Sequence, residues 1–203
     1  MQRTGTPIKR NAGFSLLELG IVLVILTILG TGALSALRLQ TERSRLLEAH
    51  SMLADAREAL LNHAAISGHL PCPDTNGDGE PDSCSGSGPI SGRLPWHLLA
   101  LPERDPWGNA LYYSVHSNFL ADRTITLKST GGIEIQAGSS SNTLANAESV
   151  VLALWSSGAD GKQGAASESP FRLHAETPDN DDQVVWLSRF VLLGRMLEAG
   201  RTL

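Results

Sequence analysis

The stretch Gly13-Phe14-Ser15-Leu16-Leu17-Glu18-Leu19-Gly20 leads into a long apolar run of this 203-residue chain. From Leu19 to Leu37 there are 19 consecutive uncharged residues, which as a helix rising about 1.5 Å per residue would nearly cover the hydrocarbon core of a bilayer. The run is rich in β-branched residues, but in lipid only a helix lets a single segment satisfy its own backbone. The sequence therefore predicts a membrane-spanning helix.

A secretory signal peptide is the alternative interpretation of this segment, because a basic tip, an apolar run and small residues such as Ala33 and Ala36 would suit one. Glu18 argues against it. Glu18 lies just inside the start of the apolar stretch, where a carboxylate costs about 2–3 kcal/mol if it is near the bilayer centre and less at an interface. An ordinary signal peptide has no use for that charge, so Glu18 predicts a functional partner.

Lys9-Arg10-Asn11-Ala12-Gly13 followed by Phe14-Ser15-Leu16-Leu17-Glu18 resembles the processing site of type IV prepilins and type II secretion pseudopilins. The resemblance implies cleavage between Gly13 and Phe14 by a prepilin peptidase, and N-methylation of the new terminal Phe14. It also implies that Glu18 neutralises the terminal amine of an adjacent subunit during assembly. Opposite charges attract strongly in a low-dielectric setting, where either alone is penalised, so such a pair can set the axial register.

The same resemblance implies an α+β, pilin-like fold, in which a long N-terminal helix packs on a small antiparallel sheet with irregular loops. The expected parts are a leader (1–13), a transmembrane or filament-core helix half (14–38), an amphipathic helix half (39–66) and a C-terminal globular domain (67–203). The expected location is the bacterial inner membrane, with a single span and a periplasmic domain, and then a pilus (fimbrium) or pseudopilus. The implied partners are other subunits, the prepilin peptidase and an inner-membrane assembly platform.

Periodicity and turn formers divide the rest of the chain. Leu39, Leu46, Leu53 and Leu60 recur every seven residues and predict that one long helix continues to about residue 66. Residues 68 to 93 are dense in Gly and Pro and predict a loop. Runs of β-branched and aromatic residues predict strands at Ala110–Val115, Thr124–Ser129, Gly132–Gln136 and Ser149–Trp155, and Val184–Leu197 fits a helix or, at its start, a strand.

The two cysteines, Cys72 and Cys84, are separated by eleven residues. In an exported chain they are expected to form a disulfide, which the chain-entropy model values at about 2–3 kcal/mol for so short a loop. Two free buried thiols are the alternative.

Within that loop, Asp74-Thr75-Asn76-Gly77-Asp78-Gly79-Glu80-Pro81-Asp82 matches the first nine positions of a calcium loop. The oxygen-bearing side chains are those of Asp74, Asn76, Asp78, Glu80 and Asp82. Ser85 stands where the pattern needs a bidentate acid, so the match is partial. Calcium is the one expected cofactor, and an Asp/Gly turn bounded by a disulfide is the alternative.

A second motif, Asp105-Pro106-Trp107-Gly108-Asn109-Ala110-Leu111-Tyr112-Tyr113, is similar to the Asp-Pro-Trp-Gly-Asn-x-x-Tyr stretch of major pseudopilins. Asp-Pro starts a turn and Gly108-Asn109 reverses the chain, while the aromatic residues supply packing area. A structural role is therefore favoured over ligand binding.

Composition argues against two broad classes of function. Removing residues 1–13 takes out three basic residues and no acid, and changes the formal charge from -5 to -8, which disfavours nucleic acid as a partner. The six histidines are dispersed, and the chain has no His-Glu-x-x-His pattern, nucleophile elbow or phosphate loop. We therefore expect no enzymatic activity.

Two hypotheses remain. The first is a structural subunit of a type IV pilus or a type II secretion pseudopilus, with minor status favoured because a long irregular loop complicates tight helical packing. The second is a ligand-binding or adhesion module in the periplasm or at the surface, tethered by the helix. A third, an anchored hydrolase, has no motif behind it.

Overall fold

The computed structural model describes residues 15–137, 143–162, 171–175 and 182–203, with side chains at 29–37, 137 and 171–175 not described. Backbone contacts divide the chain into two units, Met1–Ser44 and Arg45–Leu203. Helix α1 (Leu16–Ser67) is continuous across that boundary. The helix predicted to continue to about residue 66 is therefore confirmed.

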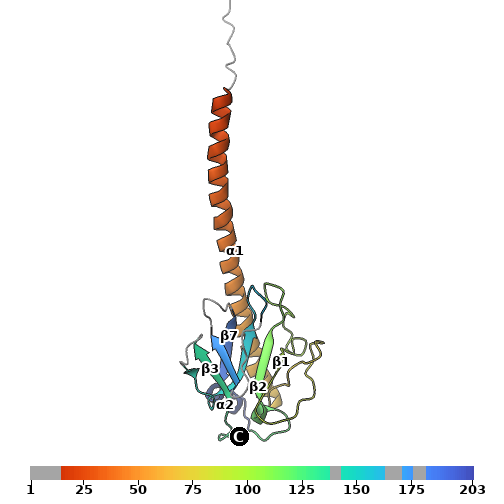
Figure 1. Ribbon diagram of the computed structural model, residues 1–203. Helices are drawn as coiled ribbons and strands as arrows, with labels where there is room; N and C mark the ends of the chain where they lie inside the picture. The colour runs from red at the N-terminus through yellow and green to blue at the C-terminus, as the bar shows by residue number, and fades with distance from the viewer. Residues whose placement is uncertain (1–14, 138–142, 163–170, 176–181) are drawn as a thin grey trace, which may run out of the picture. The chain divides into compact units, whose positions relative to one another are not determined.

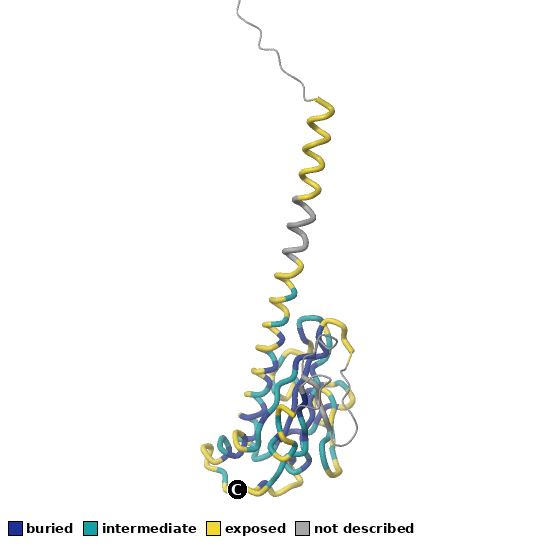
Figure 2. Tube along the Cα trace, turned by 60° about the vertical axis from the view of Figure 1, so that its left-hand side comes forward, coloured by how far each residue is buried: buried dark blue, intermediate teal, exposed yellow. Residues whose placement is uncertain are grey.

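In the first unit, every described α1 side chain except that of Glu42 is exposed. Every large apolar side chain described between Leu16 and Ile28 is at least 46% exposed (Figure 2). Within the described residues, no helix combines the length and the apolar character needed to cross a membrane.

The second unit contains a four-stranded antiparallel sheet in the order β1-β2-β5-β7 (Figure 1). Its strands are β1 (Pro89–Arg93), β2 (Tyr112–His116), β5 (Val150–Ser156) and β7 (Gln183–Ser188). Pro89 is the first residue of an edge strand, a position where a missing N–H is tolerated. All seven residues of β5 are buried, as expected for an apolar run covered on both faces.

A smaller sheet has the order β4-β3-β6, from strands β3 (Ile133–Ala137), β4 (Thr143–Ala145) and β6 (Phe171–Ala175). The β3–β6 pair is parallel, whereas β3–β4 is antiparallel. Ile133 and Ile135 of this sheet form an apolar cluster with Val150, Ala153 and Trp155 of β5. Val150, Ala153 and Trp155 of β5 therefore pack against the smaller sheet.

The main core contains other β5 side chains. Val151, Leu152 and Leu154 share one apolar cluster with residues of β2, β7 and α2 (Arg189–Glu198), and with α1 residues that follow Arg45. The α1 contribution is Leu53, Ala56, Leu60, Leu61 and Ala64. Ser188 caps α2 by accepting a hydrogen bond from the Phe190 N–H, and the 3₁₀ helix η1 (Ser117–Phe119) follows β2 directly.

The structure is α+β as predicted, but its strands differ from the expectation in several places. The predicted antiparallel sheet is present, but the sequence did not predict the second sheet, in which β6 pairs in parallel with β3. The segment predicted as a loop at 68–93 ends in strand β1. No local sequence pattern predicted that β1 pairs with β2. Val184–Leu197 divides into most of β7 and most of α2, so the strand and helix interpretations of that segment were each partly right.

Thr124–Ser129 is not a strand. Ser129 donates its backbone N–H to the Thr126 carbonyl at 2.9 Å, and the Ser129 hydroxyl accepts from the Thr126 N–H at 3.0 Å. These local hydrogen bonds take up backbone N–H and C=O groups that would otherwise pair with a neighbouring strand. Ser and Thr commonly have this effect in turns.

Candidate functional site

The start of α1 carries the predicted assembly residue. Gly13 and Phe14, the predicted cleavage and methylation site, lie outside the described residues. Ser15 precedes the helix and accepts a hydrogen bond from the Leu17 N–H at 3.3 Å, while Glu18 lies exposed in the first turn. A carboxylate is favourable there because the helix N-terminus carries partial positive charge.

Sequence reasoning missed one feature of this helix start. Ser15-Leu16-Leu17-Glu18 has the Ser-x-x-Glu spacing of a capping box, a pattern that marks helix N-termini. The spacing alone was enough to place the helix start within a residue or two.

The loop after α1 is closed by the predicted disulfide. Cys72 and Cys84 are bonded, with their Cα atoms 5.8 Å apart, and both pack against the main core. The alternative of two free thiols is therefore wrong.

Asp74 organises this loop from a buried position. Its Oδ1 accepts the Gly77 N–H at 2.5 Å and its Oδ2 accepts the Gly79 N–H at 2.9 Å. Its backbone exchanges two hydrogen bonds with Arg93, at 3.0 and 2.7 Å. The acid that the calcium pattern places first therefore joins the loop to β1.

The other predicted calcium ligands also have partners within the protein. Asp82 Oδ2 accepts from the Thr75 hydroxyl at 2.5 Å and from the Thr75 N–H at 2.7 Å, and these bonds hold the pKa of Asp82 below its usual value. Asp78 accepts from Asn76 Nδ2 and from the Glu80 N–H, and the Glu80 carboxylate pairs with His97.

The arrangement does not fit a preformed metal site. Among the described residues, no group of three or more His, Cys, Asp or Glu side chains is placed to hold a metal ion. Carboxylate oxygens that already accept backbone N–H groups must give up or share those bonds to take a cation. Calcium binding by Asp74, Asn76, Asp78, Glu80 and Asp82 stays a prediction.

The Asp-Pro-Trp-Gly-Asn turn is built around a second buried carboxylate. Asp105 Oδ1 accepts the Trp107 and Asn109 N–H groups at 3.0 and 2.8 Å, and Asp105 Oδ2 accepts the Ser156 hydroxyl at 2.6 Å. Asn109 Nδ2 donates to the Gly158 carbonyl at 2.8 Å. The motif therefore ties the turn to the end of β5, in agreement with the favoured structural role.

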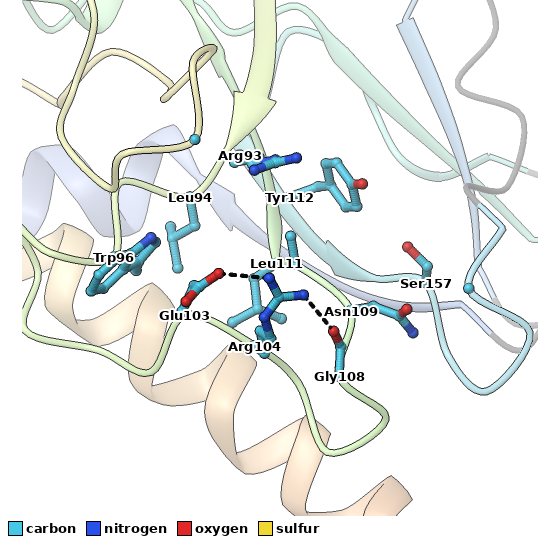
Figure 3. Close-up of a pocket in the computed structure, with 13 residues that line it drawn as sticks. Arg93, Leu94, Trp96, Glu103, Arg104, Gly108, Asn109, Leu111, Tyr112 and Ser157 are labelled. Carbon is cyan, nitrogen blue, oxygen red and sulfur yellow. Dashed lines mark hydrogen bonds and ion pairs between the residues drawn. The ribbon is translucent and has the colours of Figure 1, made fainter.

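A cavity of about 180 Å³ lies beside this turn, between loop and strand residues that are far apart in the sequence (Figure 3). Arg93 at the end of β1, Trp96 in the following loop and Tyr112 at the start of β2 line it, together with the Glu103–Arg104 pair. Arg104 contacts Glu103 Oε1 at 2.9 Å and donates to the Gly108 carbonyl at 2.9 Å. Ser157, which follows β5 and is 1% exposed, also lines the cavity.

Glycines shape the wall of this cavity. Gly77 has φ +88° and Gly79 has φ +84°, both in the left-handed region. A Cβ at Gly77 would overlap the Arg93 guanidinium, and a Cβ at Gly79 would overlap the Trp96 indole. The calcium-like spacing of Asp and Gly in the loop therefore has a second physical explanation, since it lets Arg93 and Trp96 lie close to the loop backbone.

Comparison with known proteins gives one match. No curated protein and no solved structure matches the chain. Residues 8–34, which include Glu18 and the start of α1, match the family model of the prokaryotic N-terminal methylation motif, the signal of type IV pilin-like proteins.

Proposed function

We propose that this protein is a structural subunit, a minor pilin or a pseudopilin, of a type IV pilus or a type II secretion pseudopilus. The observation that carries the proposal is the methylation motif at residues 8–34, which includes the exposed apolar stretch of α1 from Leu16 to Ile28. The motif supports a pilin- or pseudopilin-type, non-enzymatic protein that assembles with other subunits after processing by a prepilin peptidase.

The exposed surface supports assembly through α1. Ten large apolar side chains between Leu16 and Ile28 are exposed in this chain, and soluble monomers rarely expose a patch of that extent. Lipid, or the same helices of neighbouring subunits, would remove this area from water. Burial at about 25 cal/mol per Å² makes helix bundling the main driving force for a filament core.

Glu18 gives that bundle a defined register. Glu18 lies in the first turn of α1, close to the expected N-terminus at Phe14, which supports the proposal that its carboxylate pairs with the amine of an adjacent subunit. Two opposite charges buried together are tolerated, whereas a single buried charge is strongly penalised. Misaligned helices would leave both charges unpaired, so the pair selects one axial offset.

The remaining parts of the proposal follow from the family. The first helix half anchors the precursor in the inner membrane, the second unit is displayed in the periplasm, and the part of α1 after Arg45 packs on the sheet of that unit. The buried α1 side chains after Arg45 that join the main core support that packing.

A matched pair of α1 variants tests the assembly proposal. Glu18→Val removes the carboxylate of the first turn, and Glu48→Val makes the same change at another exposed α1 position. We expect both precursors to reach the membrane and fold, with Glu18→Val reducing filament incorporation at least tenfold and Glu48→Val leaving it unchanged. The measurement is the amount of each variant in sheared filaments relative to membranes. Normal incorporation of Glu18→Val would rule the proposal out.

A further inference from the structure

The cavity beside the Asp-Pro-Trp-Gly-Asn turn has a cationic lining in an acidic protein. Its charged residues are Arg93, Glu103 and Arg104, which give the lining a net formal charge of +1 in a chain of -5. A patch of opposite sign to the rest of the protein is not needed for solubility. It favours an anionic ligand.

Arg93 is a cation that has no ion pair among the described residues. Its backbone is held on both sides, by two hydrogen bonds to Asp74 and by pairing with Tyr112 across the β1–β2 ladder. Its guanidinium has no acceptor among the residues that the structure describes. Because the Arg93 backbone is fixed and its planar guanidinium is unpaired, the guanidinium N–H groups can donate to a ligand in the cavity. Binding then costs little further loss of conformational entropy.

Two hydroxyl groups beside Arg93 also lack partners within the described part of the chain. Ser157 is 1% exposed, lines the cavity, and forms no hydrogen bond through its hydroxyl. Tyr112 stacks on Trp155 with ring centroids 5.5 Å apart, and its hydroxyl is equally unbonded. Figure 3 shows Arg93, Tyr112 and Ser157 around the same side of the cavity. Both hydroxyls line the cavity without a partner among the described residues, so they are available to donate to a ligand group.

We infer that this cavity binds a small monocarboxylate, with the Arg93 guanidinium holding the two carboxylate oxygens and the Ser157 and Tyr112 hydroxyls donating to them. A planar carboxylate matches the two parallel N–H groups of a guanidinium. Arg104 is already shared between Glu103 and the Gly108 carbonyl, so among the described lining residues Arg93 is the one free cation. One free cation suits a single negative charge, whereas a phosphate dianion would bring a second charge close to Glu103.

The test uses full-length protein in non-ionic detergent micelles, titrated with sodium acetate at constant ionic strength set with chloride. Acetamide, which has the shape of acetate without its charge, and inorganic phosphate are titrated in parallel. The readouts are the NMR shifts of the Arg93 Nε–H and the Trp96 indole N–H. We expect a saturable shift with acetate, no saturable shift with acetamide, and weaker binding of phosphate than of acetate.

Two substitutions locate the site. Arg93→Gln removes the exposed guanidinium. We expect this variant to bind acetate at least about tenfold more weakly, because it loses a charge-assisted hydrogen bond. Acetate binding by the variant is measured through the Trp96 indole signal. Lys128→Gln removes one positive charge from an exposed side chain outside the cavity and should leave binding unchanged. Unchanged thermal melting of both variants shows that they are folded.

Three results would overturn the inference: no saturable shift up to 100-fold molar excess of acetate, equal responses to acetate and acetamide, or tighter binding of phosphate. Unchanged acetate affinity in Arg93→Gln would place the ligand elsewhere and refute the site. None of these results bears on filament incorporation, so failure here is distinguishable from failure of the assembly proposal.

Discussion

Two buried aspartates use the same chemistry to hold the loops of the second unit. Asp74 and Asp105 each accept two backbone N–H groups from the turn that follows them, and each also connects that turn to a distant strand. For Asp74 the connection is the backbone pairing with Arg93, and for Asp105 it is the hydrogen bond from Ser156. Single carboxylates thereby set the positions of the cavity walls.

Ala100 is a strained residue in the same region. It has φ 54°, a left-handed conformation that costs a residue with a Cβ about 1–2 kcal/mol. Ala100→Gly removes this strain but adds unfolded-state entropy of about 0.4–1 kcal/mol, so we expect a net stabilisation of about 0.5–1 kcal/mol in urea unfolding. Ala54→Gly, at an exposed position inside α1, should instead destabilise by about 1 kcal/mol. Destabilisation by Ala100→Gly would contradict the prediction.

His116 makes stability depend on pH. Burial lowers its pKa below the ordinary value of 6.5, and its Nδ1 accepts the Asn118 N–H at 3.3 Å, which requires the neutral ring at that atom. The unfolded state therefore binds more protons than the folded state below pH 6.5. The free energy of unfolding should fall as pH drops from 7.5 toward and through the lowered pKa.

His116→Asn keeps a side-chain acceptor for the Asn118 N–H and removes the titrating group. We expect a weaker pH dependence of urea unfolding between pH 7.5 and 5 in this variant. Some pH dependence of the free energy of unfolding should persist, because the pKa of His63 is also lowered, first by burial and then by the nearby charge of His69. An unchanged slope in His116→Asn would contradict the assignment.

At the scale of elements, the Cys72–Cys84 loop combines a covalent closure with an internal hydrogen-bond network. The calcium prediction for this loop can be checked on the Arg45–Leu203 segment by thermal melting in millimolar calcium. If the loop binds calcium, the ion stabilises the folded state by about 1.4 kcal/mol at ten times its Kd, and the melting temperature rises.

Asp78→Asn removes a loop carboxylate and should abolish that rise, whereas Asp122→Asn, which lies outside the loop, should preserve it. An absent shift in the unaltered segment would leave the Asp/Gly turn as the explanation of the pattern. The hydrogen bonds to Asp74 and Asp82 already hold the geometry of this turn without a metal.

At the scale of the whole molecule, the second unit has the core of an independent folding unit. Its main cluster joins the α1 side chains after Arg45 to three strands and α2, and hydrogen bonds connect the same elements, such as Arg57 Nε to the Trp186 carbonyl at 3.1 Å. We expect the Arg45–Leu203 segment to unfold in one cooperative transition. Urea midpoints from tryptophan fluorescence and from far-ultraviolet circular dichroism should coincide, and separate midpoints would contradict this.

Local patterns were sufficient for the features that depend on neighbouring residues. The leucine spacing predicted α1 to within a residue of Ser67, the apolar run predicted β5, and the spacing of two cysteines predicted the disulfide. Helix periodicity, apolar runs and short covalent loops are encoded over a few residues, so they can be read without the rest of the fold. The methylation motif belongs to the same class, since a peptidase recognises a short linear segment.

Long-range pairing decided the remainder. β1 is a strand because it pairs with β2, with Ile90 opposite Val115. β6 is a strand because it pairs in parallel with β3. The local sequence of β1 or of β6 does not predict which strand it pairs with. The cavity likewise depends on Arg93, Arg104 and Ser157, which come from three separate parts of the chain. Strand pairing and cavities arise from contacts between distant residues, and a single sequence records those contacts only through the fold that brings them together.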